Sequence, residues 1–230
     1  MRDTAEVLGG LDLSGTKTRL LAIVANPRGA EDACRFAEIA FLGYPLSVSE
    51  TFQQRNTNRS IAAALDELAL IQEACEKSGK TLVVYLSMGF GNPYGDPYSP
   101  ALTVDFTKKL AERGVRVVAP SDTVGTATPE AITALFSELI PTFPTIEFGA
   151  HLHSRPDEVE AKVAAAYAAG VRRMDGALRG FGGCPMASDT LTGNLPTERV
   201  AAWLAEQGVA LGLDEAAFAE AMAYSSHLFV

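Results

Sequence analysis

Two histidines stand out among the residues whose type and spacing could do chemistry. His151 and His153 flank a leucine at the end of an apolar stretch, and the chain has 3 histidines in all. Because strand side chains alternate, residues two apart point to the same face. Two neutral imidazoles side by side are natural adjacent ligands for a divalent metal ion. The alternative is a pair of exposed loop histidines.

Other polar groups follow neighbouring apolar stretches. Asp122 lies in the sequence SDTVGT, where it is either a carboxylate at the mouth of a site or part of a helix-capping turn. Cys184 follows three closely spaced glycines, which is unusual for a small buried hydrophobe. Asn194 either caps a turn or reaches the same site. Residues 87–100, rich in Gly, Pro and Tyr, form either a surface turn or a substrate-facing loop.

Together these groups suggest hard-cation chemistry on a carbonyl or hydroxy-acid substrate. Neutral imidazoles and oxygen ligands hold a divalent ion, and the ion polarises a substrate oxygen. A nearby thiol or carboxylate would move the proton.

The elements that must position these residues alternate along the chain. Apolar, β-branched runs alternate with stretches of helical period, which indicates parallel βα units. Strands are predicted near 20–25, 36–42, 81–88, 115–119, 146–153 and 171–176. Helices are predicted near 60–77, 100–112, 129–140, 156–169 and 196–207. Ser60 is a plausible N-cap, and Pro129 and Pro156 suit first helical turns.

This alternation predicts an α/β fold, a TIM (β/α) barrel that is incomplete at its N-terminus. Only about six of eight βα units are recognisable, and we expect residues 1–230 to form a single partial barrel domain. A doubly wound sheet is the alternative, but it normally shows a Gly-rich phosphate turn after an early strand. The sequence AIVANPRGAED is not such a turn. In a barrel, working groups lie at the carboxyl ends of the strands.

The amino-acid composition limits the partners and the cellular location that we expect. The 230 residues include 47% hydrophobic and 20% charged ones, with 19 Lys and Arg against 28 Asp and Glu, a formal charge of −9. An acidic chain disfavours a nucleic-acid partner. The three cysteines lack CxxC spacing, so neither a disulfide framework nor a zinc ribbon is indicated. No apolar run is long enough for a membrane span, and a cytoplasmic location is expected.

Five segments, in order, carry a resemblance to a known family. They are FGNPYGDP (90–97), SDTVGTATP (121–129), GAHLH (149–153), GFGGCPM (180–186) and TGNLPTE (192–198). The chain resembles 3-hydroxy-3-methylglutaryl-CoA lyases of the DRE-TIM metallolyase superfamily, from residue 1 to about residue 210. Related condensing enzymes, such as isopropylmalate and homocitrate synthases, share the HxH strand and lack the GGCP loop.

The resemblance implies cleavage of 3-hydroxy-3-methylglutaryl-CoA to acetyl-CoA and acetoacetate, with Mg²⁺ or Mn²⁺ as cofactor. It implies that His151, His153 and Asn194 are metal ligands and that Cys184 is the proton-transferring thiol. It further implies catalytic roles for Asp122 and His151. The expected partner is an acyl-CoA substrate, without nucleic acid or membrane, and a homodimer is expected.

The sequence also departs from the family pattern. The family opens with a strand whose Asp ligates the metal and whose Arg stabilises the enolate. Arg2-Asp3-Thr4 matches that motif in letters only, because no strand precedes it, and neither Arg2 nor Asp3 is given a catalytic role. Ser154 stands where Asp often follows HxH, and Asn92 stands where Cys is frequent.

Three alternatives follow from these departures. In the first, the chain is the carboxyl-terminal part of a longer lyase, which the codons upstream of Met1 would test. In the second, it is a catalytically impaired metal-binding remnant of a barrel. In the third, it is a condensing enzyme that makes a 2-hydroxy acid.

Overall fold

Six parallel strands form one sheet in chain order, as the sequence pattern predicts. The computed structural model describes residues 3–184 and 192–228. The strands are β1 (Leu20–Ile23), β2 (Ile39–Ser47), β3 (Thr81–Ser87), β4 (Val117–Asp122), β5 (Glu147–Leu152) and β6 (Arg173–Met174). All six lie within three residues of a predicted strand start.

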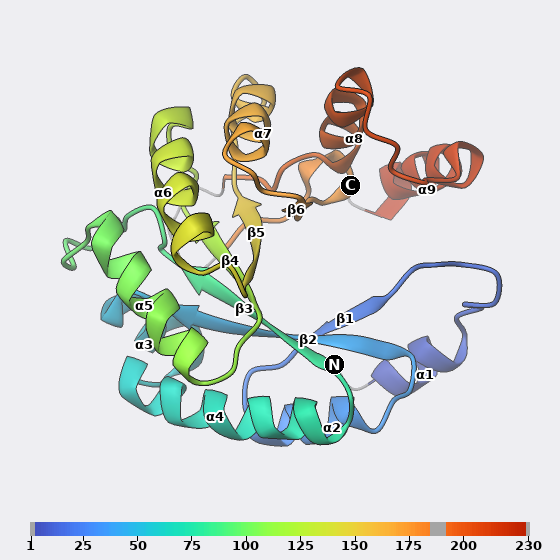
Figure 1. The fold of residues 1–230 in the computed structure, drawn as a ribbon. Coiled ribbons are helices and arrows are strands. Elements are labelled where there is room, and N and C mark those ends of the chain that lie inside the picture. The colour runs from blue at the N-terminus through green and yellow to red at the C-terminus, as the bar shows by residue number, and fades with distance from the viewer. Residues whose placement is uncertain (1–2, 185–191, 229–230) are drawn as a thin grey trace.

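Helices connect the strands and cover the outer face of the sheet (Figure 1). They are α1 (Thr4–Gly9), α2 (Pro27–Cys34), α3 (Glu50–Thr57), α4 (Ile61–Lys77), α5 (Pro100–Glu112), α6 (Pro129–Thr142), α7 (Val159–Ala168), η1 (Leu178–Gly180), α8 (Thr197–Glu206) and α9 (Glu215–Leu228). Figure 1 shows the sheet curling around a concave side that stays open between β1 and β6. The fold is α/β, a curled half-barrel consistent with an incomplete TIM barrel of six βα units.

The predicted helix starts are mostly confirmed. Ser60 precedes α4 and its hydroxyl accepts a hydrogen bond from the Ala63 N–H at 3.2 Å. Pro129 occupies the first turn of α6. The prediction for Pro156 is wrong, because residues 156–158 form a turn and α7 begins only at Val159. Helices α2, α3 and α9 were not predicted.

Strand β2 runs five residues beyond its predicted end because two strand breakers are accommodated there. The Val24 N–H donates to the Gly43 carbonyl at 2.8 Å, so the backbone of Gly43 faces β1. Pro45 faces the same side two residues later, beyond the last residue of β1, where a missing N–H costs no ladder bond. A Cβ on Gly43 would lie 2.5 Å from Ile23 Cδ1 and 2.9 Å from Tyr85 Cε2. The close approach of these side chains therefore requires glycine.

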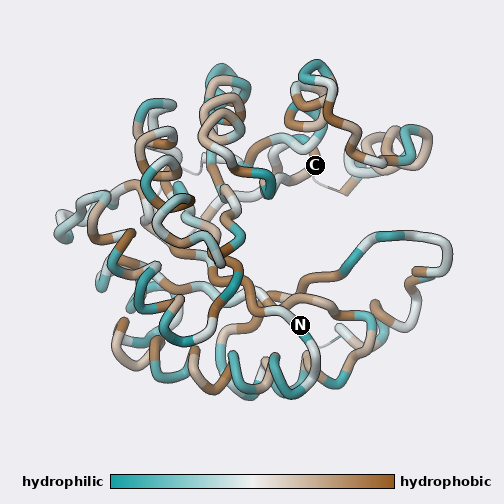
Figure 2. The backbone as a smooth tube through the Cα atoms, viewed as in Figure 1, coloured by the Kyte–Doolittle hydropathy of each residue, from teal (hydrophilic) through white to brown (hydrophobic). Residues whose placement is uncertain are grey.

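The core lies between the sheet and its outer helices. Figure 2 shows hydrophobic segments along the central strands and hydrophilic ones mainly on the outer helix turns. Buried side chains of β2, β3 and β4 pack against buried side chains of α4, α5 and α6, among them Leu68, Leu110 and Phe136. This packing holds the strand ends in fixed positions. None of the helices in the described part of the chain is both long and apolar enough to cross a membrane.

The strands at the two edges of the sheet generate a prediction about association. β1 pairs only with β2 and β6 only with β5 within residues 3–184 and 192–228, and Ile23 on β1 is 63% exposed. Unpaired edges with exposed apolar side chains favour edge-to-edge association, and a lysine on such an edge opposes it. We therefore expect the 230-residue chain to elute as a dimer or larger species in size-exclusion chromatography with light scattering. Ile23→Lys should shift it toward monomer.

The matched control for this prediction is Leu70→Lys, which places the same charge on the outer surface of α4 at a side chain that is 55% exposed. It should leave the association state unchanged. A wild-type chain that runs as a monodisperse monomer and melts cooperatively would contradict the prediction.

Candidate active site

The predicted site residues gather at the carboxyl ends of β3 to β6, around an open cavity of about 750 Å³. His151 on β5 lies in register with Ser121 on β4, and both line the cavity. His153, Cys184 and Asn194 also line it. The structure thus brings four of the five predicted site residues to one place.

His151 is held by two neighbours that sequence reasoning did not single out. Its Nδ1 lies 3.2 Å from Oδ2 of Asp175, which follows β6. The ring of Tyr85 on β3 meets the His151 ring edge-on, with centroids 5.3 Å apart. Burial, followed by the charge of Asp175, raises the pKa of Tyr85 to about 12, so its hydroxyl stays protonated. Because a carboxylate only accepts, the Nδ1–H of His151 is the donor in this contact, and the neutral ring then has its lone pair on Nε2.

His153 is more deeply buried, at 4% exposure, and is fixed in the same tautomer. Its Nδ1 lies 2.8 Å from the carbonyl oxygen of Thr123, which can only accept, so Nδ1 carries the proton here too. Burial, and then the neighbouring His151, lower the pKa of His153 below its ordinary 6.5. The ring centroids of the two histidines are 5.5 Å apart. The alternative of two exposed loop histidines is therefore wrong.

Asn194 stands beside His153 across an isolated antiparallel bridge. Its Nδ2 donates to the Phe181 carbonyl at 2.8 Å, which leaves Oδ1 as its remaining polar atom. Its backbone N–H donates to the Gly180 carbonyl at 3.1 Å, and a Cβ on Gly193 would lie 2.7 Å from that same oxygen. Gly193 is therefore required for this approach, which places Asn194 against the histidines.

The glycine-rich segment brings Cys184 to the cavity wall as a half-buried free thiol. Gly180, Gly182 and Gly183 all have positive φ, the conformation that favours glycine. Pro185 and Met186 of the GFGGCPM motif lie outside the described residues, as does Arg2. Asp3 immediately precedes α1 and does not line the cavity.

The expectation that Asp122 faces the mouth is wrong. Ser121 and Thr123 line the cavity, and strand alternation turns the side chain between them to the opposite face. Asp122 is 1% exposed and pairs with Lys162 of α7, with Oδ2 3.0 Å from Nζ. Its carboxylate also accepts from the N–H groups of Thr126 at 2.9 Å and Ala127 at 3.1 Å. The structure therefore shows the turn-stabilising arrangement for this aspartate.

The segment after β3 is an ordered turn, and within residues 87–100 the cavity is lined by Ser87, the last residue of β3. Asn92, where the family often has Cys, organises this turn. Its Oδ1 accepts from the N–H groups of Tyr94 and Asp96, and its Nδ2 donates to the Asp96 carbonyl. The Asp96 carboxylate in turn accepts from the Ser49 hydroxyl and from the Thr51 N–H and hydroxyl. This link ties the turn to the start of α3.

Sequence reasoning missed Asp175, Tyr85 and Lys162 as site-supporting residues. Asp175 is the next-to-last residue of the predicted strand 171–176, and a carboxylate at the carboxyl end of a predicted barrel strand was a usable signal. Tyr85 sits inside an apolar strand, where only the strand register shows which face it takes.

Asn56 lines the cavity, whereas Asn58 ends α3 in a left-handed conformation with φ of 54°.

Fold and site together define a TIM-barrel-type α/β protein with a histidine pair, an amide oxygen and a thiol at the carboxyl edge of its sheet. Residues 9–224 match the family model described as HMGL-like. The chain belongs to this family.

Individual relatives agree with the family match. The chain is 32% identical over 225 residues, 97% of its length and 68% of the relative, to mitochondrial hydroxymethylglutaryl-CoA lyase of Bos taurus. The crystal structure of the HMG-CoA lyase of Bacillus subtilis superposes with a TM-score of 0.89 at 26% identity, covering 99% of this chain and 75% of that one. An HMG-CoA lyase from Acinetobacter baumannii, solved with coenzyme A and 3-methylmalate, gives a TM-score of 0.81 at 26% identity and covers 91% and 67%.

The link through Asp96 generates a prediction about acid stability. Hydrogen bonds from Ser49 and then Thr51 lower the pKa of Asp96 from its ordinary 3.8. A lowered folded-state pKa means that the stabilisation is present above pH 3.8 and is lost as pH falls through the lowered value. We expect Asp96→Asn to reduce the free energy of unfolding by about 1 kcal/mol at pH 7, as measured by urea titration. The gap between wild type and variant should close below pH 3.8.

Asp105→Asn on the exposed face of α5 is the matched control and should show no such pH-dependent gap. A gap for Asp96→Asn that stays constant down to pH 3 would contradict the prediction.

Proposed function

We propose that the chain cleaves 3-hydroxy-3-methylglutaryl-CoA to acetyl-CoA and acetoacetate. The observation that supports this most directly is the convergence of His151, His153, Asn194 and Cys184 on one cavity in a chain of the HMGL-like family. The relatives' names give a lyase acting on hydroxymethylglutaryl-CoA, and the coenzyme A bound to the Acinetobacter baumannii enzyme supports an acyl-CoA ligand here.

The residues present fit a divalent cation, Mg²⁺ or Mn²⁺. Both imidazoles carry their proton on Nδ1, so each offers Nε2 as a lone-pair donor, and Asn194 offers Oδ1. Acceptors for the Nδ1–H groups of metal-binding histidines are the usual means of fixing ring orientation. His151, His153 and Asn194 would hold the ion, which would polarise the substrate oxygen as a Lewis acid.

The reaction is a retro-Claisen cleavage without redox change. The 3-hydroxyl loses its proton as its carbon becomes a carbonyl, the bond to the thioester-bearing carbon breaks, and that carbon takes up a proton. While Nε2 of His151 holds the cation it cannot also accept the 3-hydroxyl proton, which would pass to solvent in the open cavity. Cys184 is the thiol at the cavity wall, and in this proposal its S–H donates the proton that the thioester-bearing carbon takes up.

The surroundings of these groups support the same chemistry. The strand ends, α3 and the glycine-rich segment line the cavity, and their side chains around a bound substrate would displace water from the developing enolate. Asp122 is left out of the reaction because its carboxylate lies on the other face of β4. A homodimer and a cytoplasmic location complete the proposal.

Turnover of the purified chain tests the proposal. With 3-hydroxy-3-methylglutaryl-CoA and Mg²⁺ or Mn²⁺, we expect acetoacetate to be released, and chelation should abolish the release. Cys184→Ser should lower kcat by about 10²–10⁴-fold, the range for loss of a general acid.

Cys34→Ser is the matched control, because Cys34 is also half-buried but lies at the end of α2, away from the cavity. It should keep wild-type kcat. No acetoacetate from the folded, metal-supplied chain would sink the lyase proposal in favour of a metal-binding remnant. A 2-hydroxy acid formed from acetyl-CoA and a 2-oxo acid would instead favour a condensing enzyme.

The partner of His151 generates a separate prediction. Asp175→Asn removes the charged acceptor of the His151 Nδ1–H and should weaken Mn²⁺ binding about 10–100-fold, the usual effect of losing such a partner. Calorimetric titration with Mn²⁺ measures this without substrate. Asp66→Asn, an exposed aspartate of α4, is the control. Unchanged Mn²⁺ affinity in Asp175→Asn would show that Asp175 does not support a metal ligand.

A further inference from the structure

A buried lysine side chain lies behind the cavity and plays no part in the proposed reaction. The side chain of Lys162 on α7 is 2% exposed, and it does not line the cavity. Lysine is rarely buried to this degree unless its charge is paired. Its environment therefore calls for a structural explanation.

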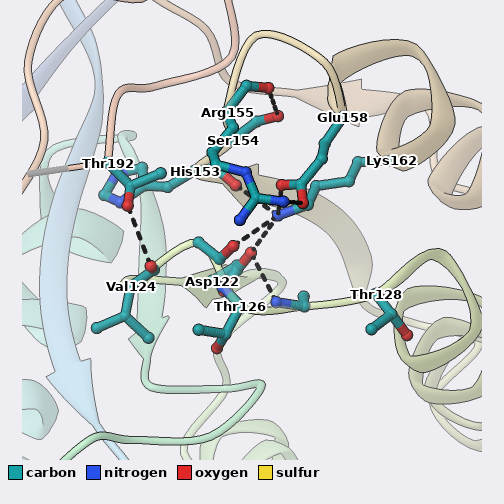
Figure 3. Close-up of polar contacts among 12 residues, drawn as sticks. Asp122, Val124, Thr126, Thr128, His153, Ser154, Arg155, Glu158, Lys162 and Thr192 are labelled. Carbon is teal, nitrogen blue, oxygen red and sulfur yellow. Dashed lines mark hydrogen bonds and ion pairs between the residues drawn. The ribbon is translucent and has the colours of Figure 1, made fainter.

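The ammonium group of Lys162 has an acceptor for each of its three protons. Nζ lies 3.0 Å from Asp122 Oδ2, 3.0 Å from the Gly125 carbonyl oxygen and 2.9 Å from the His153 carbonyl oxygen. These acceptors come from the end of β4, the loop after β4 and the residue after β5, and Figure 3 shows Lys162 reaching across from α7 toward Asp122 and His153. Glu158 Oε2 stands farther away, at 3.6 Å.

The same loop also holds the ring of His153. Thr123, next to Asp122 in the chain, accepts the His153 Nδ1–H through its carbonyl oxygen. The Thr123 hydroxyl accepts from the Met88 N–H at 2.9 Å, which ties the loop to the end of β3. Lys162 thus binds the backbone of His153 directly and immobilises, through Asp122 and Gly125, the loop whose Thr123 carbonyl sets the tautomer of that ring.

The loop touches the opposite wall of the site as well. A Cβ on Gly125 would lie 2.5 Å from Thr192 Cγ2, and the Thr192 hydroxyl donates to the Val124 carbonyl at 3.3 Å (Figure 3). Thr192 lies two residues before Asn194. The loop that Lys162 immobilises therefore also contacts the segment that carries Asn194.

We propose that Lys162 is a positioning residue, which sets the direction of the His153 Nε2 and the spacing between His153 and Asn194. This inference rests on the proposed metal site. If Lys162 only balanced the charge of Asp122, its bonds to two backbone carbonyls would have no explanation. Asp122 is in addition already bonded by two backbone N–H groups. An apolar side chain of similar length would leave the His153 and Gly125 carbonyls without this donor.

The test compares wild type with Lys162→Met and with the neutral pair Asp122→Asn/Lys162→Met. The double variant is included because Lys162→Met alone leaves the Asp122 carboxylate buried without its counter-charge. The first readout is the His153 tautomer, from imidazole ¹⁵N NMR of the metal-free protein at pH 8. The second is Mn²⁺ affinity from calorimetric titration.

We expect the Nδ1–H tautomer alone in wild type, a mixture of tautomers in both variants, and a rise of at least tenfold in the Kd for Mn²⁺. Leu68→Ala, at a buried position of α4, serves as the control for lost stability and should change neither readout. Should Lys162→Met not fold, the double variant decides alone.

Wild-type tautomer and wild-type Mn²⁺ affinity in the folded double variant would overturn the proposal and leave Lys162 as a counter-charge only. If wild type itself binds no Mn²⁺, the proposed metal site fails. The tautomer comparison still determines whether Lys162 orients His153.

Discussion

Side-chain alternation at the paired ends of β4 and β5 is the constraint on which the site depends. Ser121 stands opposite His151 in the parallel register, so both face the cavity, and Asp122 opposite Leu152 faces the helices. A one-residue slip of β4 would bring a carboxylate into the cavity, and a one-residue slip of β5 would turn both imidazoles away from it. The register is fixed by the apolar residues of these strands that pack under α6 and α7, so core packing and site chemistry are set by the same pairing.

The buried Lys162–Asp122 pair strengthens this arrangement from the outer side. Removing an ion from water costs several kcal/mol, and the attraction of its partner offsets that cost only when the remaining hydrogen bonds are also made. Here the ammonium has three acceptors and the carboxylate has three donors, so little bonding capacity is lost on burial. The pair therefore holds α7, the end of β5 and the loop after β4 together at low net cost. Its value lies in specifying one arrangement of the strand ends.

The elements with strong local signals were predictable from the sequence. Ser60 and Pro129 fix helix starts through capping and restricted φ, and the six strands follow from apolar runs. The extension of β2 was not predictable, because Gly43 and Pro45 normally end strands and are accepted here only through neighbours distant in sequence. Pro156 failed as a helix start because a proline also suits a turn, and only the surrounding structure selects between the two.

The site residues, too, include some that the sequence could predict and some that it could not. The HxH spacing places two imidazoles on one face by strand geometry alone, and this prediction held for His151 and His153. Asp122 looked equally well placed, but which face a strand residue takes depends on register with its neighbour, and a single strand does not reveal that register. Asp175 and Lys162 act through partners 24 and 40 residues away, so their contributions emerge only when the strands are assembled.

The side chains of the site are oriented by contacts that do not involve the open side of the half-barrel. The histidines lie on β5 and directly after it, and Asn194 and Cys184 lie in the segment after β6. The orienting partners of the histidines come from β3, from the residues after β4 and β6, and from α7. None of these contacts involves β1, which borders the opening in Figure 1. The ligand geometry is therefore set by one side of the sheet. The enclosure of the substrate also involves Ile23 of β1, Pro45 of β2 and Phe52 of α3, which line the same cavity. Substrate enclosure therefore depends on β1, β2 and α3 as well, whereas the orientation of the imidazoles is set by contacts from β3, the loop after β4, the residue after β6 and α7.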